Sequence, residues 1–186
     1  MPAVSDPGAA LVKYCQDNSI KYDVLPGPSA AVTAFAASGF EESKFTFFGF
    51  LPRSGKEREN QLKKVLSNPY VSILYEAPHR LLKLLEEIAR KDPERDLFLA
   101  KELTKKYQKF YKDSAKKLFE NLKYENVKGE WVVVISPGKP LSESLLSIED
   151  ILSLDIPKKQ KAKLLSKISG KTPKEWYEKL ISNGDE

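Results

Sequence analysis

At 186 residues, with 41% hydrophobic and 31% charged side chains, the chain has the composition of a globular protein of one domain or one and a half, and collagen-like and disordered classes are excluded. Its formal net charge of +5 is modest. No apolar run approaches the roughly 18 residues of a membrane helix, and the N-terminus lacks the basic start and apolar block of a secretory signal. We therefore expect a cytoplasmic protein with no membrane partner.

The chain has one cysteine, Cys15, and one histidine, His79. An intrachain disulfide is therefore impossible, a Cys/His zinc site cannot be assembled, and we expect no metal. Cys15 shares the apolar face of a predicted helix with Leu11 and Val12. We interpret it as a small buried hydrophobe rather than a nucleophile.

The first part of the chain predicts helices around one short strand. The expected elements are a helix over 7–16, a strand over 22–25 and a helix over 29–38. Asp6 can cap the first helix, with Pro7 at its first position, and Gly39 stops the second. A turn over 26–30, with the sequence PGPSA, opens the second helix.

From residue 45 the pattern changes to strands separated by helices. The expected strands are 45–50, 71–76, 97–103, 131–136 and, more weakly, 107–111; the expected helices are 56–66, 79–89 and 114–122. The 101–111 region is too short to hold a crossover helix between parallel strands. We therefore predict an α/β fold with a mixed five-stranded sheet.

A boundary at Gly138-Lys139-Pro140 precedes a helical tail. Helices are expected over 148–154 and 158–168, and Thr172 caps a last helix that begins at Pro173. The tail resembles a helix-turn-helix with a basic flank, since 157–171 holds six lysines and no acid, while 101–128 holds nine lysines against four acids. Such patches are typical of surfaces that bind nucleic acid, but an ordinary solvent-exposed, lysine-rich surface has the same sequence pattern.

Four short stretches carry the polar groups that a site needs: 5–8, 26–30, 75–80 and 101–105. Each follows a predicted strand, where open α/β sheets place their ligand crevices. Glu76 and Arg80 could form a charge-assisted pair at such a crevice, or merely tie strand to helix. His79 could move a proton at neutral pH, or could cap a helix. No phosphate-loop, dinucleotide, zinc-protease or nucleophile-elbow motif is present.

Six motifs, in order, resemble one family. They are SDPGAALV, LPGPSAAVTAFAASGF, FFGFLPRSGKER, YEAPHRLLKLLEEI, LAKELTKKYQKFY and KGEWVVVIS. Together they cover residues 1–137 and are similar to the tetrapyrrole methylase superfamily. The phrases FGFLPRSGK, YEAPHR and KELTK favour its ribosomal RNA small-subunit methyltransferase I group over the enzymes that methylate tetrapyrroles.

The resemblance implies a homodimer in which each chain binds S-adenosylmethionine between two α/β domains. It implies methyl transfer to the ribose 2′-hydroxyl of a cytidine in 16S ribosomal RNA of the small subunit. The implied cofactor-binding residues are Ser29, Ala30, Tyr75, Glu76, Ala77 and Thr104. Candidates for the general base that deprotonates the hydroxyl are Glu76, His79 and Glu102. The basic residues expected to bind the RNA substrate are Arg53, Lys56, Arg80, Lys105, Lys158 and Lys159.

The resemblance also divides the chain into three parts. Residues 1–26 are expected to be the last helix and strand of an N-terminal Rossmann-like, cofactor-binding domain, 27–138 the C-terminal α/β methylase domain, and 139–186 the helical tail. The family's glycine-rich turn and Ser-Asp-Ala-Gly loop, upstream of SDPG, are absent, so the chain reads as a C-terminal portion. Two alternatives stay open: a noncatalytic RNA- or DNA-binding module that uses the basic tail, and a tetrapyrrole methylase.

Overall fold

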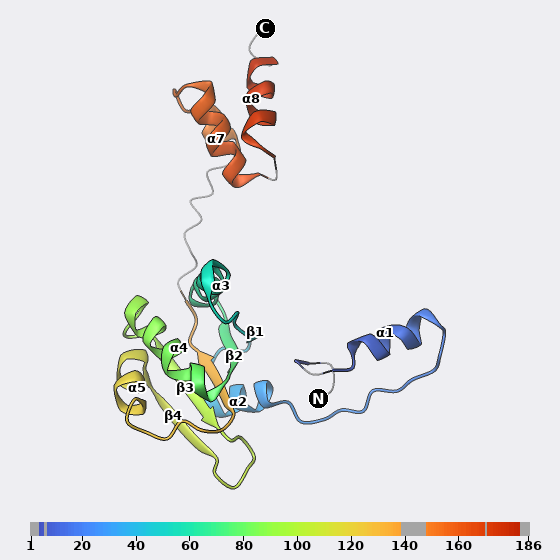
Figure 1. The fold of residues 1–186 in the computed structure, drawn as a ribbon, viewed down its shortest axis with the longest axis vertical. Helices are drawn as coiled ribbons and strands as arrows, with labels where there is room; N and C mark the ends of the chain where they lie inside the picture. Colours follow the sequence, from blue (N-terminus) through green and yellow to red (C-terminus); the bar gives the residue numbers. More distant parts are fainter. Residues whose placement is uncertain (1–3, 6, 139–147, 170, 183–186) are drawn as a thin grey trace. The chain divides into compact units, whose positions relative to one another are not determined.

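The computed structural model describes residues 4–5, 7–138, 148–169 and 171–182 (Figure 1). It divides into two compact units, Met1–Leu141 and Ser142–Glu186. No helix in the described ranges is both long and apolar enough to cross a membrane.

The first unit is built on a mixed five-stranded sheet. Its strands are β1 (Phe45–Phe50), β2 (Val71–Glu76), β3 (Asp96–Lys101), β4 (Lys109–Ser114) and β5 (Trp131–Ile135), in the spatial order β1-β2-β5-β3-β4. β1 and β2 are parallel and are joined through a helix, whereas every other neighbouring pair is antiparallel. The prediction of a mixed sheet is confirmed.

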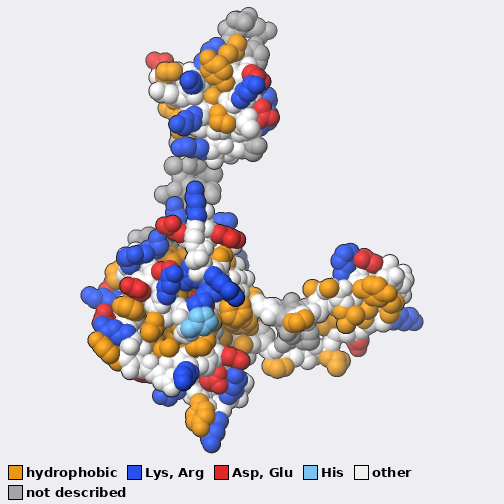
Figure 2. Space-filling model, in the orientation of Figure 1, with side chains coloured by type: hydrophobic (Ala, Val, Ile, Leu, Met, Phe, Trp, Pro, Cys, Tyr) orange, Lys and Arg blue, Asp and Glu red, His pale blue; other side chains and the backbone are white. Residues whose placement is uncertain are grey.

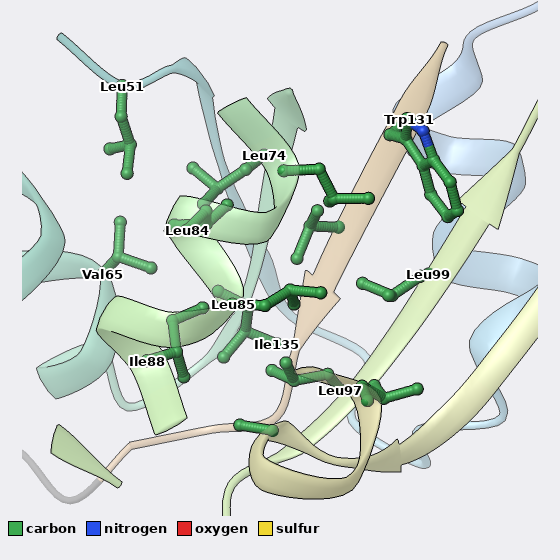
Figure 3. Close-up of a cluster of buried hydrophobic side chains, with 14 of the residues drawn as sticks. Leu51, Val65, Leu74, Leu84, Leu85, Ile88, Leu97, Leu99, Trp131 and Ile135 are labelled. Carbon is green, nitrogen blue, oxygen red and sulfur yellow. The ribbon is translucent and has the colours of Figure 1, made fainter. Parts of the chain in front are cut away.

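Helices cover both faces of this sheet. They are α2 (Ala30–Ser38), α3 (Gly55–Ser67), α4 (Pro78–Lys91) and α5 (Ala115–Leu122). Buried leucines of α3, α4 and α5 pack on one face of the sheet, and the alanines of α2 pack on the other. Figure 3 shows Leu84 and Leu85 of α4 converging with Leu74 and Ile135 of the sheet. Successive side chains of a strand point to opposite faces of the sheet, so alternate strand residues contribute to the two hydrophobic layers on either side of it.

The N-terminal segment departs from two predictions. Residues 22–25 form no strand, because they pair with no described strand, and Tyr22, Val24 and Leu25 are exposed. The helix α1 (Ala9–Asp17) is present but buries none of its residues, and Cys15 is only partly covered. The interpretation of Cys15 as a small buried hydrophobe was therefore wrong as regards its burial. The proposed cap, Asp6, lies outside the described residues.

Two strands, β3 and β4, also differ from their predicted ranges by more than one residue. β3 ends at Lys101 rather than at residue 103, because Glu102 has a φ of 49° and turns the chain out of the extended conformation. β4 runs from Lys109 to Ser114, later than the predicted 107–111.

The described residues of the second unit form three helices, α6 (Ile148–Ser153), α7 (Lys158–Ile168) and α8 (Pro173–Ser182), close to the predicted ranges. Ile151, Ala162 and Leu165 form its buried contacts. Thr172 caps α8 as predicted: the Glu175 N–H donates to its Oγ1 at 3.3 Å, and its own N–H donates to Glu175 Oε2 at 2.7 Å. The predicted boundary at Gly138-Lys139-Pro140 falls mostly outside the described residues, and the three-part domain division stays a prediction.

The packing of the first unit can be tested by shortening Leu85, which is 0% exposed. Leu85→Ala should lower the free energy of unfolding by about 2–5 kcal/mol, because it removes buried methyl groups and leaves a cavity. Leu25→Ala is the matched control, since Leu25 is 76% exposed. Urea denaturation in a Trp176→Phe background follows this unit through Trp131 fluorescence. Equal midpoints for the two variants would contradict the assigned core.

Candidate functional site

A cavity of about 640 Å³ opens at the ends of the inner strands of the five-stranded sheet. Glu76, the last residue of β2, is paired with Trp131, the first residue of β5, and Trp131 is also paired with Lys101 at the end of β3. The cavity therefore lies where the ends of three strands meet. The first turn of α2 contributes a further wall.

Half of the predicted site residues line this cavity. They are Ser29, Ala30, Tyr75, Glu76, Ala77, Thr104 and Lys105. The stretches 75–80 and 101–105 reach it from strand ends, as predicted. The stretch 26–30 reaches it as the start of α2 and does not follow a strand. Residues far apart in the sequence are thus gathered around one space.

The remaining predicted residues lie elsewhere. Arg53, Lys56, His79, Arg80 and Glu102 are not among the residues that line the cavity, and Lys158 and Lys159 belong to α7 in the second unit. His79 is exposed in the first turn of α4. Arg53 and Lys56 are exposed beside the start of α3.

Several cavity residues were missed from the sequence. They include Thr33, Phe50, Leu103, Glu130 and Trp131. Phe50 is the last residue of a predicted strand, so the rule that located 75–80 could have found it. Trp131 is the first residue of a predicted strand, where that rule does not apply. Thr33 lies one turn beyond Ser29 in α2, but nothing in the sequence indicates that this face of the helix meets a cavity.

Glu76 carries a fully buried carboxylate, with a side-chain exposure of 0%. Oε1 accepts from the Ala77 N–H at 3.0 Å and lies 3.2 Å from Arg80 Nε. Oε2 lies 3.8 Å from Arg58 Nη1 and has no hydrogen-bond partner among the described residues. Burial raises the pKa of the carboxyl above its ordinary value, although the Ala77 N–H and both arginines act to lower it.

Arg58 is a further member of this cluster, which sequence reasoning missed. It is 3% exposed, although it lies in a strongly charged stretch of α3. Its Nη2 donates to Glu87 Oε2 at 2.8 Å and its Nε at 3.0 Å, while Nη1 donates to the Pro52 carbonyl at 3.0 Å. No signal in the sequence singles out Arg58 from its charged neighbours.

The two arginines hold the segment that follows β1. Arg80 Nη2 donates to the carbonyls of Leu51 and Pro52 at 2.7 and 3.0 Å, and Arg58 donates to the same Pro52 carbonyl. Both guanidinium groups also flank Glu76. The buried carboxylate therefore fixes two arginines, which in turn fix the backbone next to Phe50 in the cavity wall. The pairing of Glu76 with Arg80 is confirmed.

Tyr75 joins the sheet to α2. Its hydroxyl accepts a hydrogen bond from the Ala31 N–H at 3.2 Å. Its ring meets those of Phe47 and Phe50 edge-on, with centroids 4.8 and 5.7 Å apart. Such edge-to-face contacts restrict the ring beyond simple burial. These contacts therefore hold the aromatic rings that line the cavity in fixed positions.

The rim at 102–105 is a tight turn with unusual backbone angles. Glu102 and Thr104 have φ angles of 49° and 64°, which non-glycine residues rarely adopt. The Glu102 N–H donates to the Glu130 carbonyl at 2.9 Å, and the Glu130 N–H donates to Glu102 Oε1 at 2.7 Å. These reciprocal bonds hold the strained turn against the strand beside it.

Charge also stabilises this rim. Lys105 Nζ lies 3.2 Å from Glu102 Oε1 and 3.1 Å from Glu130 Oε2. The Glu130 N–H, together with Lys105, lowers the pKa of the Glu102 carboxyl, and the hydrogen bonds to both carboxylates raise the pKa of Lys105. Gly129 gives this cluster room, because a Cβ there would lie 2.8 Å from Glu102 Cγ.

Comparisons with known proteins agree with this architecture. Residues 1–118 match the sequence profile of the tetrapyrrole (corrin/porphyrin) methylases. The chain is 47% identical, over 98% of its length, to ribosomal RNA small subunit methyltransferase I of Campylobacter fetus and covers 67% of that protein. It is 40% identical, over 95% of its length, to the protein of the same name from Helicobacter pylori strain 26695 and covers 63% of it. The chain thus spans about two thirds of the length of these relatives.

Solved structures agree at the level of the fold. The methyltransferase CobJ matches 73% of the chain with a TM-score of 0.54 at 18% identity, and the chain covers 61% of it. Uroporphyrin-III C-methyl transferase from Thermus thermophilus, solved with S-adenyl homocysteine, matches 72% with a TM-score of 0.51 at 14% identity, and 61% of it is covered. With its profile match over more than half of the sequence, the chain belongs to the tetrapyrrole methylase family.

Proposed function

We propose that this chain is the larger part of an S-adenosylmethionine-dependent methyltransferase that modifies the ribose 2′-hydroxyl of a cytidine in 16S ribosomal RNA. The observation that carries the proposal is the cavity at the end of β2, where residues of the motifs PGPSA, YEAPHR and KELTK meet. The ribosomal relatives at 40–47% identity support this substrate. The proposal includes a cytoplasmic location and a homodimer.

The cavity residues fit the methyl donor. When bound, the cofactor supplies a methyl group on a positively charged sulfur, ready for transfer to an oxygen nucleophile. The rings of Tyr75 and Phe50 offer an aromatic wall that suits an adenine base. The small side chains of Ser29, Ala30 and Ala77 leave room for close approach. The contribution of the protein is then to hold donor and hydroxyl in line.

Two other functions are less well supported. The tetrapyrrole methylases among the solved structures are only 14–18% identical, a level at which likeness extends to the fold alone. A noncatalytic binding module would need only the basic helices of the second unit. That function does not explain the cavity in the first unit. We therefore favour methylation of ribosomal RNA over both of these functions.

The identity of the general base stays a prediction. Among Glu76, His79 and Glu102, only Glu76 lines the cavity. Its carboxylate is buried between Arg58 and Arg80, which favours a positioning role over direct contact with substrate. Glu102 is committed to the rim. His79 is exposed and would need the bound RNA to bring the hydroxyl to it.

The expected RNA contacts also stay predictions, and their surroundings differ. Arg53, Lys56, Lys158 and Lys159 are exposed and make no side-chain ion pair or hydrogen bond with described residues, so they are available to phosphates. Lys105 lines the cavity, beside the proposed donor. Arg80 uses its donors on Glu76 and on two carbonyls, which suits support of the site better than direct binding.

The first test concerns the methyl-donor site. Tyr75→Ala should weaken the binding of S-adenosylhomocysteine by at least about fivefold, because stacking of a base on an aromatic ring contributes about 1–3 kcal/mol. Isothermal titration calorimetry measures the effect. Tyr124→Ala is the matched control, since Tyr124 is 84% exposed and does not line the cavity. If both variants bind like the natural chain, the cavity is not the donor site.

The second test concerns the ionisation of Glu76. Its pKa in the folded chain is raised above the ordinary 4.5, so the folded state binds this proton more tightly than the unfolded state does. Relative to Glu76→Gln, the natural chain should therefore lose stability as the pH rises from 4.5 through the folded pKa, by at most about 1.4 kcal/mol per pH unit. Urea unfolding of both proteins across this range measures the difference. A relative stability that increases with pH would mean that the arginines outweigh burial.

A further inference from the structure

A second hollow, of about 340 Å³, lies between α3 and α4 and shares no lining residue with the cavity at the end of β2. We call it the α3–α4 groove. The residues that line it and carry the argument are Arg58, Glu59, Lys83, Glu87, Arg90 and Lys91. None of the three outer cations, Lys83, Arg90 and Lys91, was singled out by the sequence.

The buried Arg58 changes the charge balance of this groove. Glu87 is four residues after Lys83 and three before Arg90, so on an isolated helix it would pair with either. In the folded chain both of its oxygens accept from Arg58 instead, at 2.8–3.3 Å. Of the two acids between Lys83 and Arg90 on α4, Glu87 is therefore occupied by a cation from α3, while Glu86 is exposed.

The outer cations are consequently left free. The side chains of Lys83, Arg90 and Lys91 are exposed and make no ion pair or hydrogen bond within the described part of the chain. Besides the paired Glu87, Glu59 is the one acid among the described residues that lines the groove. Glu57 and Glu86 are exposed on the same two helices, without an ion pair to any described residue. The groove thus keeps a surplus of positive charge.

More positive charge lies beside it. Arg53 and Lys56, at the start of α3, are exposed and also unpaired with described residues. Figure 2 shows Lys and Arg side chains gathered on one face of the first unit, next to its histidine. The positions of Lys83 and Arg90 are seven residues apart on α4, about 10 Å along the helix axis. One phosphate ion cannot satisfy cations spread over that length, whereas a strand with repeating charges can.

We propose that the α3–α4 groove binds the phosphodiester backbone of an RNA strand through Lys83, Arg90 and Lys91. The inference rests on the proposed function and adds a substrate-binding site to it. Arg90 supplies a planar fork of donors and the two lysines supply point charges, both of which suit phosphate oxygens. Arg58 acts as a positioning residue by withdrawing Glu87 from these cations.

The test compares the salt dependence of RNA binding in two triple variants of the full chain. Lys83→Gln, Arg90→Gln and Lys91→Gln together remove the groove cations. Lys21→Gln, Lys44→Gln and Lys64→Gln remove the same charge from exposed positions that do not line the groove and lie outside the basic patches at 101–128 and 157–171. The probe is a fluorescein-labelled single-stranded RNA oligonucleotide, with binding followed by fluorescence anisotropy over a salt series.

The groove variant should bind more weakly and show a salt slope smaller by about 2, because each phosphate contact to single-stranded nucleic acid contributes about 0.7. The control should keep the natural slope to within about one contact. Inorganic phosphate at constant ionic strength should not displace the RNA. Equal slopes in the groove variant and the natural chain, an equal loss in the control, or displacement by phosphate would each overturn the groove assignment.

The proposed function is judged by a separate readout. Calorimetry with S-adenosylhomocysteine on the same groove variant should give the natural affinity, since no groove residue lines the cavity. If the groove variant shows the same RNA salt slope as the natural chain while S-adenosylhomocysteine still binds, only the groove assignment is contradicted. No RNA binding by the natural chain would overturn the groove and count against the RNA substrate as well.

Discussion

The carboxylate of Glu76, buried between Arg58 and Arg80, is the constraint on which the site depends. A charge without exposure is costly unless opposite charges and donors surround it. Glu76 meets this requirement only in part, because Oε1 is paired with Arg80 and the Ala77 N–H, whereas Oε2 has no hydrogen-bond partner among the described residues. Both guanidinium groups beside it also donate to the carbonyls that follow β1. Ionic and hydrogen-bond contacts therefore link the end of β2 to the α3–α4 groove and to the segment after Phe50, which is part of the aromatic wall.

The network also separates two chemical environments. On one side, Tyr75 and Phe50 border a largely apolar cavity suited to a cofactor. On the other, Arg58 neutralises Glu87 and leaves the cations of α4 facing solvent. One buried arginine thus contributes to both, because its guanidinium reaches towards Glu76 with one nitrogen and towards Glu87 with the others. Donor binding and strand binding can then be altered independently at the surface.

The sequence predicts most of the sheet and much of the site, for physical reasons that also explain the failures. Strands such as Val71–Glu76 have either alternating apolar and polar residues or a continuous apolar run, and turn residues flank them. Their ends could therefore be located from the sequence. Residues 22–25 have the same composition but no partner strand, which local pattern cannot reveal. The turn at Glu102 depends on bonds with Glu130, which lies far along the chain. Arg58 likewise acquires its role only through tertiary contacts.

A double-mutant cycle on the affinity for S-adenosylhomocysteine tests most directly whether Glu76 and Arg80 act as one unit in shaping the cavity. Glu76→Gln, Arg80→Gln and the combined variant are titrated by calorimetry beside the natural chain. We expect each single change to weaken binding and the double variant to bind no more weakly than the worse single one, because either change releases the same backbone. Additive losses, or natural affinity in both single variants, would contradict this account.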